Sequence, residues 1–315
     1  MKAVVIRSFG KPEVLAIEDL QEPLISEKDI LVETIAGSIN PIDWKQRKGN
    51  HRFIFGSHFP IVLGYDVSGI VRRIGTKVQN FSVGDSVCGV LNNKYGGGLS
   101  QFVRGSEKCF TKVPSSVDLG RSAAMPLSGL TALQALRDKG KIASGMKVLI
   151  IGAAGGVGHF AIQVAQIYEC EVFAVTSEKH KDFINNLAKT TFIDYQKEDF
   201  LNSTERFHII FDTVGKYSFP KCKHLLSSNG VYINTLPRPK ILVHKFLSLF
   251  TQQKKVRTLL MRHLPTDLHL LISWVQSGQL KIGIDKEFSI HEIAEAHAYS
   301  EAGHTQGKIL IRYQW

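Results

Sequence analysis

The spacing of hydrophobic and polar positions changes near residue 120. Before that point, short runs alternate as β-strands do, and Gly, Pro, Asn and Asp separate them. The pattern predicts a block of short strands with one helical stretch, at 41–48. This block has about the size of a small barrel-like domain. Its predicted strands include residues 2–7, 30–39, 67–74 and 86–90.

After residue 121 the predicted strands alternate with helices. Apolar residues at helical spacing predict a helix over 122–139. Alternation of strand and helix is typical of a parallel sheet with helices on both faces, because the crossovers are right-handed. The further predicted strands are 147–151, 171–176, 192–194, 207–212 and 230–234, and the further predicted helices are 157–167, 179–188 and 266–278.

The C-terminal tail returns to a strand pattern. Residues 282–288 and 308–313 read as strands, with a helix between them. We expect this tail to complete the first domain. The first domain would then comprise residues 1–121 and 266–315, and residues 122–265 would form a second domain inserted into it. The cleft between two such domains is the expected active site.

Composition places the chain among ordinary globular proteins. It has 315 residues, of which 43% are hydrophobic and 21% charged. Its four cysteines are scattered without a Cys-x-x-Cys pair, which argues against a disulfide framework or a zinc knuckle. No apolar run has the length of a membrane span, and the N-terminus does not read as a signal peptide. We therefore expect a cytoplasmic protein.

The formal net charge of +11 suggests an anionic partner, such as nucleic acid, lipid or a phosphorylated cofactor. The basic residues are spread along the chain and are densest at 245–263. Apolar residues interrupt that stretch, so it reads as one amphipathic helix with a solvated face. We do not expect nucleic-acid binding to be the main role, and the role of the stretch stays open.

A glycine-rich turn joins a predicted strand to a predicted helix. Residues 148–158 read Val-Leu-Ile-Ile-Gly-Ala-Ala-Gly-Gly-Val-Gly. Such a turn lets the backbone approach a pyrophosphate, and the helix N-terminus offers it free N–H groups. A helix packed tightly on a sheet without a ligand is the alternative. The turn residues of the predicted dinucleotide site are Ala154, Gly155, Gly156, Val157 and Gly158.

Several motifs, in order, resemble the medium-chain dehydrogenase/reductase superfamily, and more narrowly its zinc-independent quinone oxidoreductase (ζ-crystallin-like) branch. Besides the glycine turn they are Asn-Pro-Ile-Asp at 40–43, Gly-Tyr-Asp-Val-Ser-Gly at 64–69, Val-Gly-Asp-Ser-Val at 83–87, Ala-Ala-Met-Pro-Leu at 123–127 and Gly-Leu-Thr-Ala at 129–132. The resemblance covers essentially the whole chain. It implies an α/β protein with a GroES-like, β-barrel-type catalytic domain and a Rossmann domain with a doubly wound parallel sheet. It also implies a nicotinamide cofactor and a homodimer.

The same comparison bears on metal binding. Zinc-dependent members of the superfamily carry a Cys at or near Asn40, Gly-His-Glu where this chain has Gly-Tyr-Asp at 64–66, and a four-cysteine lobe that is absent here. A catalytic zinc needs about three ligands, so we expect no metal. An unusual set of His51, His58 and Asp66 is disfavoured. Without a Lewis acid, a quinone or an activated C=C bond (enone or alkenal) is a better hydride acceptor than a ketone.

The cofactor expected from the residues is NADPH. NAD sites usually have an acid at the end of the second strand, but here Thr176 and Ser177 stand there. Ser177, Lys179 and Tyr195 match positions that bind the 2′-phosphate in the NADPH-using quinone oxidoreductases that this chain resembles. The alternative is a solvated helix start with ordinary surface charges. The predicted cofactor site also includes Thr176, Lys181, Gly215, Asn234 and Leu236.

The predicted catalytic residues are Asn40, His51 and Thr131. Related proteins often carry a Tyr where this chain has His51, so His51 is either a proton donor near neutral pH or a loop residue facing water. Asn40, Asp43 and Thr131 match positions that line the family's cleft. Asp43 could instead cap the helix after Pro41, and Thr131 could only fill space. The proton could also come from solvent.

Two other functions remain open at this point. An enoyl-thioester reductase would need basic groups for the phosphates of its substrate, and the stretch 245–263 contains such groups. A non-enzymatic role, as an NADPH-linked RNA-binding or crystallin-like protein, would need an exposed basic face with stacking aromatics. The sequence does not identify the physiological acceptor.

Overall fold

The computed structural model describes residues 1–50, 52–235 and 254–315, which form two compact units. The second unit begins at Ser128, whereas the sequence analysis placed the domain boundary after residue 121. The first unit comprises Met1–Leu127, His263–Gly278 and Ile282–Trp315, and the second comprises Ser128–Arg262 and Gln279–Lys281.

The first unit is built on a large, mostly antiparallel sheet with the order β15-β16-β3-β5-β6-β8. Strand β3 lies at its centre and pairs with β5, β7 and β16. Ile309 of β16 pairs with Ile39 of β3, so the C-terminal tail is part of the same sheet as the first strands. A smaller sheet has the order β2-β1-β4.

Several strands of the first unit are buried on both sides: residues 3–6 and 308–311 are each four consecutive buried positions. The strands are β1 (Lys2–Ile6), β2 (Ala16–Asp19), β3 (Asp29–Ile39), β4 (Ile61–Val62), β5 (Asp66–Ile74), β6 (Ser86–Val90), β7 (Phe102–Ser106), β8 (Phe110–Lys112), β15 (Ile284–Ser289) and β16 (Lys308–Arg312). The helical elements are η1 (Pro12–Val14), α1 (Pro41–Arg47), α2 (Arg52–Phe55), η2 (Glu107–Cys109), α3 (Leu119–Ser122), α9 (Pro265–Gln276), η7 (Ile290–Glu292) and α10 (Ile293–Ala302).

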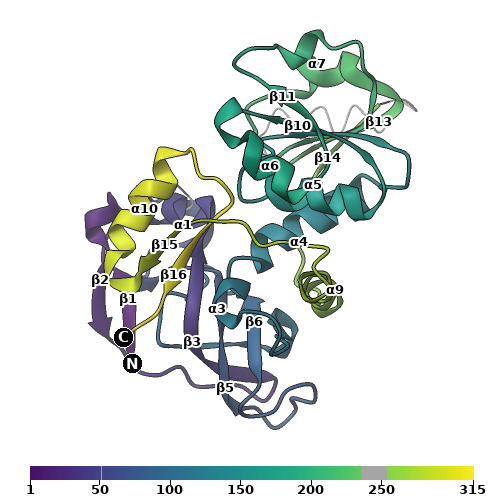
Figure 1. The fold of residues 1–315 in the computed structure, drawn as a ribbon. Helices are drawn as coiled ribbons and strands as arrows, with labels where there is room; N and C mark the ends of the chain where they lie inside the picture. The colour runs from purple at the N-terminus through teal and green to yellow at the C-terminus, as the bar shows by residue number, and fades with distance from the viewer. Residues whose placement is uncertain (51, 236–253) are drawn as a thin grey trace. The chain divides into compact units, whose positions relative to one another are not determined.

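The second unit contains six parallel strands in the order β11-β10-β9-β12-β13-β14. From β9, the strands β10 and β11 follow one another toward one edge of the sheet. The strands β12, β13 and β14 follow one another from β9 toward the other edge. The order therefore reverses beside β9, and ligands of such sheets bind at that reversal, outside the carboxyl ends of the strands. Helix α5 packs on β9 and β10, and Figure 1 shows it beside α6 along the sheet.

Apart from two predicted helices that are corrected below, the predicted strands and helices of this unit are present, with shifts at their ends. The strands are β9 (Lys147–Ile151), β10 (Glu171–Thr176), β11 (Thr191–Asp194), β12 (Phe207–Asp212), β13 (Leu226–Asn234) and β14 (Lys255–Thr258). The helical elements are η3 (Ala135–Lys139), α5 (Gly158–Ile167), η4 (Glu178–His180), α6 (Lys181–Leu187), η5 (Phe200–Asn202), α7 (Phe219–Cys222) and η6 (Lys223–Leu225), and α4 (Pro126–Gln134) continues from the first unit into the second.

Two sequence-based predictions of secondary structure are wrong. The helix predicted over 122–139 is interrupted: α3 ends at Ser122, α4 begins at Pro126, and the last turn is a π-helix at Ala135–Lys139. Proline has no N–H and suits the first turn of a helix, so Pro126 starts a new helix.

The second correction concerns the basic stretch 245–263, predicted to be one amphipathic helix. Residues 245–253 lie outside the described residues. Lys255–Thr258 form strand β14, which pairs with β13, and Val256 is fully buried in the apolar core of the sheet. The burial of Val256 and the hydrogen bonds to β13 outweigh the weak helical spacing. Within the described ranges, no helix is both long enough and apolar enough to cross a bilayer.

Candidate cofactor and active site

The glycine turn follows β9 at the reversal of the sheet. Gly152 has a φ of +80°, a left-handed conformation that favours glycine. Its N–H and that of Ala153 donate to the carbonyl oxygen of Val175 at 3.0 and 3.1 Å, which ties the turn to β10. The predicted turn residues 154–157 come next, and α5 begins at Gly158. The turn and the N-terminus of α5 thus lie where a dinucleotide pyrophosphate would bind.

Gly158 and Gly155 differ in the space that the protein leaves for a side chain. A Cβ on Gly158 would overlap the carbonyl oxygen of Gly152 and lie 2.8 Å from backbone atoms of Ala153. Gly158 therefore lets the start of α5 lie close against the turn that follows β9. A Cβ on Gly155 would have only the Gly152 oxygen near it, at 3.4 Å. The protein itself leaves space beside Gly155, as a site for a pyrophosphate requires.

The predicted 2′-phosphate residues gather at the carboxyl ends of β10 and β11. Thr176 and Ser177 are 95% buried. The N–H of Tyr195 donates to the carbonyl oxygen of Thr176 at 3.3 Å, which brings Tyr195 beside them, with 44% of its surface exposed. The structure thus brings together Ser177 and Tyr195, which are eighteen positions apart in the chain.

The two predicted lysines have different surroundings. Lys179 lies in η4, and no ion pair involves it among the residues that the structure describes. Lys181 begins α6, and its Nζ lies 3.5 Å from Glu178 Oε1 and over the ring of Phe192. Glu178 also pairs with Lys197, at 3.2 Å, and these ion pairs lower its pKa.

Lys216 is a further cation at this edge that the sequence analysis missed. Its Nζ lies 5.9 Å from the centre of the Tyr195 ring. Lys216 comes directly after Gly215, beyond the fourth strand of this sheet in sequence, and no local pattern predicts Tyr195 as its neighbour, because β9 and β10 separate β12 from β11 in the sheet.

Asp212 organises the loop that contains Gly215. Its buried carboxylate accepts hydrogen bonds from the N–H groups of Val214, Gly215 and Tyr217 at 2.7–3.1 Å. Asn234 Nδ2 also donates to it, at 3.4 Å. Burial raises the pKa of Asp212. Two predicted cofactor residues, Gly215 and Asn234, thus share Asp212 as a partner. The predicted Leu236 lies outside the described residues.

In the first unit, a buried polar cluster surrounds Asn40. We call it the Asp66 cluster. Asn40 is 99% buried and is held on both sides of its amide: its Nδ2 donates to Asp66 Oδ2 at 2.8 Å, and its Oδ1 accepts from Lys308 Nζ at 2.5 Å. The members of the cluster are Ser38, Asn40, Asp43, Asp66 and Lys308.

Asp43 caps helix α1, which was one of the two interpretations of this residue. Its Oδ2 accepts a hydrogen bond from the backbone N–H of Asn40 at 2.7 Å. Burial and, less strongly, the carboxylate of Asp66 raise the pKa of Asp43 to about 7. Burial also lowers the pKa of Lys308, while Asp66 opposes that shift. The sequence analysis considered Asp66 only as a metal ligand and did not single out Lys308, since burial of a strand lysine is not visible in its pattern.

The other predicted catalytic residues are less well placed by the structure. Thr131 lies in α4, in the second unit, and is 91% buried. His51 lies outside the described residues. The three predicted catalytic residues are therefore not brought together by any described contact.

Tyr65 stands where zinc-dependent relatives carry a histidine, and it is bonded within the protein. Its hydroxyl donates to the carbonyl oxygen of Lys94 at 2.7 Å and accepts from Gln46 Nε2 at 2.7 Å. His58 is exposed, whereas Asp66 is buried. No three His, Cys, Asp or Glu side chains form a group suited to a metal in the described part of the chain.

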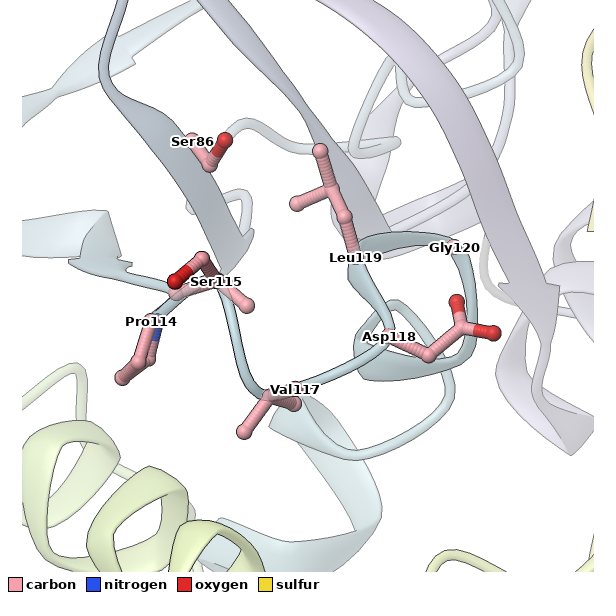
Figure 2. A pocket seen from close by; sticks show the side chains of 8 residues that line it. Ser86, Pro114, Ser115, Val117, Asp118, Leu119 and Gly120 are labelled. Atoms are coloured by element: carbon pink, nitrogen blue, oxygen red, sulfur yellow. The ribbon is translucent and has the colours of Figure 1, made fainter.

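The first unit contains a cavity of about 460 Å³ (Figure 2). Figure 2 shows Ser86 on β6 facing the segment before α3. Asp118 in that segment accepts a hydrogen bond from the N–H of Arg121 and so caps α3. None of the predicted site residues lines this cavity. Its lining residues are Ser86, Val113, Pro114, Ser115, Val117, Asp118, Leu119 and Gly120.

Two models of known protein families match the chain, one in each half. Residues 26–115 match the alcohol dehydrogenase GroES-like domain, and residues 187–311 match the zinc-binding dehydrogenase domain.

Individual relatives match over the whole length. The chain is 31% identical to a chloroplast envelope quinone oxidoreductase homolog of Arabidopsis thaliana, over 99% of this chain and 98% of the relative. It is 27% identical to an NADPH-dependent alkenal/one oxidoreductase of the same plant, over 99% and 79%.

Among solved structures, the quinone oxidoreductase of Coxiella burnetii superposes with a TM-score of 0.92 at 30% identity, covering 100% of this chain and 99% of that one. The fold, the order of the motifs and the full-length matches agree. The chain belongs to the quinone oxidoreductases of the medium-chain dehydrogenase/reductase superfamily.

Proposed function

We propose that this protein is an NADPH-dependent reductase that transfers hydride to a quinone or to the activated C=C bond of an enone or alkenal. The observation that carries the proposal is the space beside Gly155, at the reversal of the sheet and at the start of α5. Relatives named as a quinone oxidoreductase homolog and as an NADPH-dependent alkenal/one oxidoreductase support this acceptor class.

The chain's own residues fit a nicotinamide dinucleotide. The backbone of Ala154, Gly155 and Gly156 would face the pyrophosphate, and the N-terminus of α5 would stabilise its charge. Ser177, Lys179 and Tyr195 would bind the 2′-phosphate of NADPH, helped by Lys216 beside the Tyr195 ring. The absence of an acidic side chain at the end of β10 supports NADPH over NADH.

A bound cofactor of this type supplies the hydride. We propose that Asn40 and Thr131 position the reacting groups, and that the reaction needs no metal. Asn40 and Tyr65 already have hydrogen-bond partners within the protein, and a metal would have to displace them. A quinone or an enone spreads the incoming negative charge over its own conjugated system, so the chemistry does not require a Lewis acid.

The test is a screen of NADPH oxidation against quinones, enones, alkenals and enoyl thioesters, with ketones as the control class. We expect turnover of quinones or enones and none of simple ketones. Preferred turnover of enoyl thioesters would redirect the proposal to that substrate class. If no acceptor supports NADPH oxidation while single-stranded RNA binds and NADPH displaces it, a binding role replaces the enzymatic one.

The proton source is tested at His51, whose proposed place is on the acceptor side. General acid catalysis typically accelerates a reaction about 10²–10⁴-fold. A quinone product anion is stabilised by its own ring, whereas an enolate needs a hydrogen bond. We therefore expect His51→Ala to slow enone reduction much more than quinone reduction. Equal losses for both acceptors would assign His51 a positioning or structural role, and no loss would assign protonation to solvent or another group.

We further propose a homodimer located in the cytoplasm. Light scattering coupled to size-exclusion chromatography would give the mass of the particle, to be compared with the 35.1 kDa of one chain. A monomer that retains full activity would contradict the proposed assembly.

A further inference from the structure

Lys308 is a buried lysine at the start of β16, the strand between β15 and β3 in the first unit's large sheet. Its side chain is 2% exposed, and its Nζ lies 2.5 Å from Asn40 Oδ1 and 3.3 Å from Asp66 Oδ2. Burying an ammonium group is costly unless it is paired and hydrogen-bonded. A lysine is therefore unusual at a core position, and the groups that it contacts indicate its role.

Asp66 is the centre of the Asp66 cluster. Besides Lys308, its carboxylate accepts from Ser38 Oγ at 2.7 Å, from Asn40 Nδ2 at 2.8 Å and from the backbone N–H of Leu127 at 2.8 Å. These donors come from β3, from the residue before α1 and from the first turn of α4. The buried ion pair thus connects β5 and β16 with β3, the residue before α1 and the first turn of α4.

The pair also determines the orientation of the Asn40 amide. The amide oxygen faces the ammonium group of Lys308, and the amide nitrogen faces the carboxylate of Asp66. Turning the amide over would place its N–H groups against the ammonium and its oxygen against the carboxylate, which is unfavourable on both sides. With either ion removed, this preference weakens.

We propose that Lys308 and Asp66 are positioning residues of the reductase site: they hold the Asn40 amide in one orientation and anchor the start of α4, the helix that carries Thr131. This inference rests on the proposed function, in which Asn40 and Thr131 position the reacting groups. Lys308 and Asp66 act through these residues and need not touch substrate.

The test compares Lys308→Met, which keeps the length of the side chain and removes its charge, with Lys286→Met. Lys286 is an exposed lysine of the adjacent strand β15 and serves as the matched control. We expect Lys308→Met to lower kcat by about 10- to 100-fold, as small misplacements of reacting groups do, with the Kd for NADPH nearly unchanged. Lys286→Met should match the wild type in both. An unchanged kcat in folded Lys308→Met would overturn the inference.

Lys308→Met leaves the Asp66 carboxylate buried without its counter-ion, and that variant could fail to fold. The double variant Lys308→Met/Asp66→Asn removes both charges and is the second protein for the same measurements. It should fold and should show the same loss of kcat, because the amide has lost both ionic partners. Wild-type kcat in the folded double variant would also overturn the inference.

A spectroscopic measurement separates this inference from the proposed function. With ¹⁵N-asparagine labelling, the side-chain amide signal of Asn40 can be assigned by its loss in Asn40→Ser. We expect that signal to shift or broaden in Lys308→Met and to stay in place in Lys286→Met. An unchanged signal would show that Lys308 does not orient the amide. If the signal moves but the wild type reduces no acceptor, the proposed function fails while the contact between Lys308 and Asn40 stands.

Discussion

At the scale of single residues, Lys179 and Lys181 offer a direct test of the cofactor preference. Lys181 is engaged with Glu178, whereas Lys179 has no ion-pair partner among the described residues. A charge-assisted hydrogen bond is worth roughly 1.5–3 kcal/mol. We expect Lys179→Ala to weaken NADPH binding about tenfold or more and to leave NADH binding nearly unchanged, as measured by equilibrium titration.

Lys181→Ala is the matched control for that measurement. Because its ammonium group is shared with Glu178, its removal should weaken NADPH binding much less than the removal of Lys179. Equal losses for NADPH and NADH in Lys179→Ala would remove the 2′-phosphate assignment. A larger effect at Lys181 would show that the ion pair with Glu178 opens when the cofactor binds.

The raised pKa of Asp43 predicts that the stability of the protein depends on pH. Burial raises its pKa to about 7, whereas an unfolded chain has an Asp pKa near 3.9. Between these values the folded state holds the extra proton, so the free energy of unfolding falls as pH rises, by at most roughly 1.4 kcal/mol per pH unit. The contribution is fully present below about pH 4 and is lost above about pH 7.

Asp43→Asn should remove that slope. The asparagine stays neutral at every pH, and its Oδ1 can accept the same hydrogen bond from the N–H of Asn40. We expect the variant to be more stable than the wild type at about pH 8 and to show a flatter profile from about pH 4 to 7. Urea unfolding across that range measures both. A slope that persists in Asp43→Asn would assign the titration to another group.

At the scale of elements, the turn between β9 and α5 contains one glycine needed for packing and one expected to be needed for cofactor binding. A Cβ on Gly158 overlaps the turn's own backbone, whereas a Cβ on Gly155 has space. We expect Gly158→Ala to destabilise the protein by about 1–3 kcal/mol, the usual cost of overpacking. Gly155→Ala should unfold at the wild-type temperature but lose NADPH affinity.

Thermal unfolding without cofactor and titration with NADPH give the two quantities for each variant. Wild-type affinity in Gly155→Ala would mean that the pyrophosphate does not lie against this turn. Wild-type stability in Gly158→Ala would mean that α5 can move away from β9 at little cost.

At the scale of the whole molecule, the proposed chemistry predicts independence from metal ions. Asn40 and Tyr65, which stand where zinc ligands occur in related dehydrogenases, are bonded to other residues of the protein. We expect exhaustive chelation to leave the rate of NADPH oxidation and the thermal unfolding temperature unchanged. A rate that is lost with chelator and restored by zinc would contradict this prediction.

The sequence by itself determined the elements whose signals are local. The glycine turn, the strand before it, the helix after it and the capping of α1 by Asp43 each depend on residues close together in the chain. Hydrophobic spacing and turn chemistry report such features directly. The alternation of strand and helix then predicted a parallel sheet, and the family resemblance predicted the first unit; the structural comparison confirms this fold class.

Only the tertiary structure decided which distant residues became neighbours. Lys308 and Asn40 are 268 positions apart, and they meet because β16 pairs with β3. Lys216 lies over the Tyr195 ring although β12 and β11, the strands before these two residues, are separated by β9 and β10 in the sheet. The pairing of β14 with β13 replaced a predicted helix with a strand. Spacing along a chain indicates which side of an element is buried. The partner that covers it is set by long-range pairing and by the cost of burying charge without a counter-ion, and a local pattern reports neither.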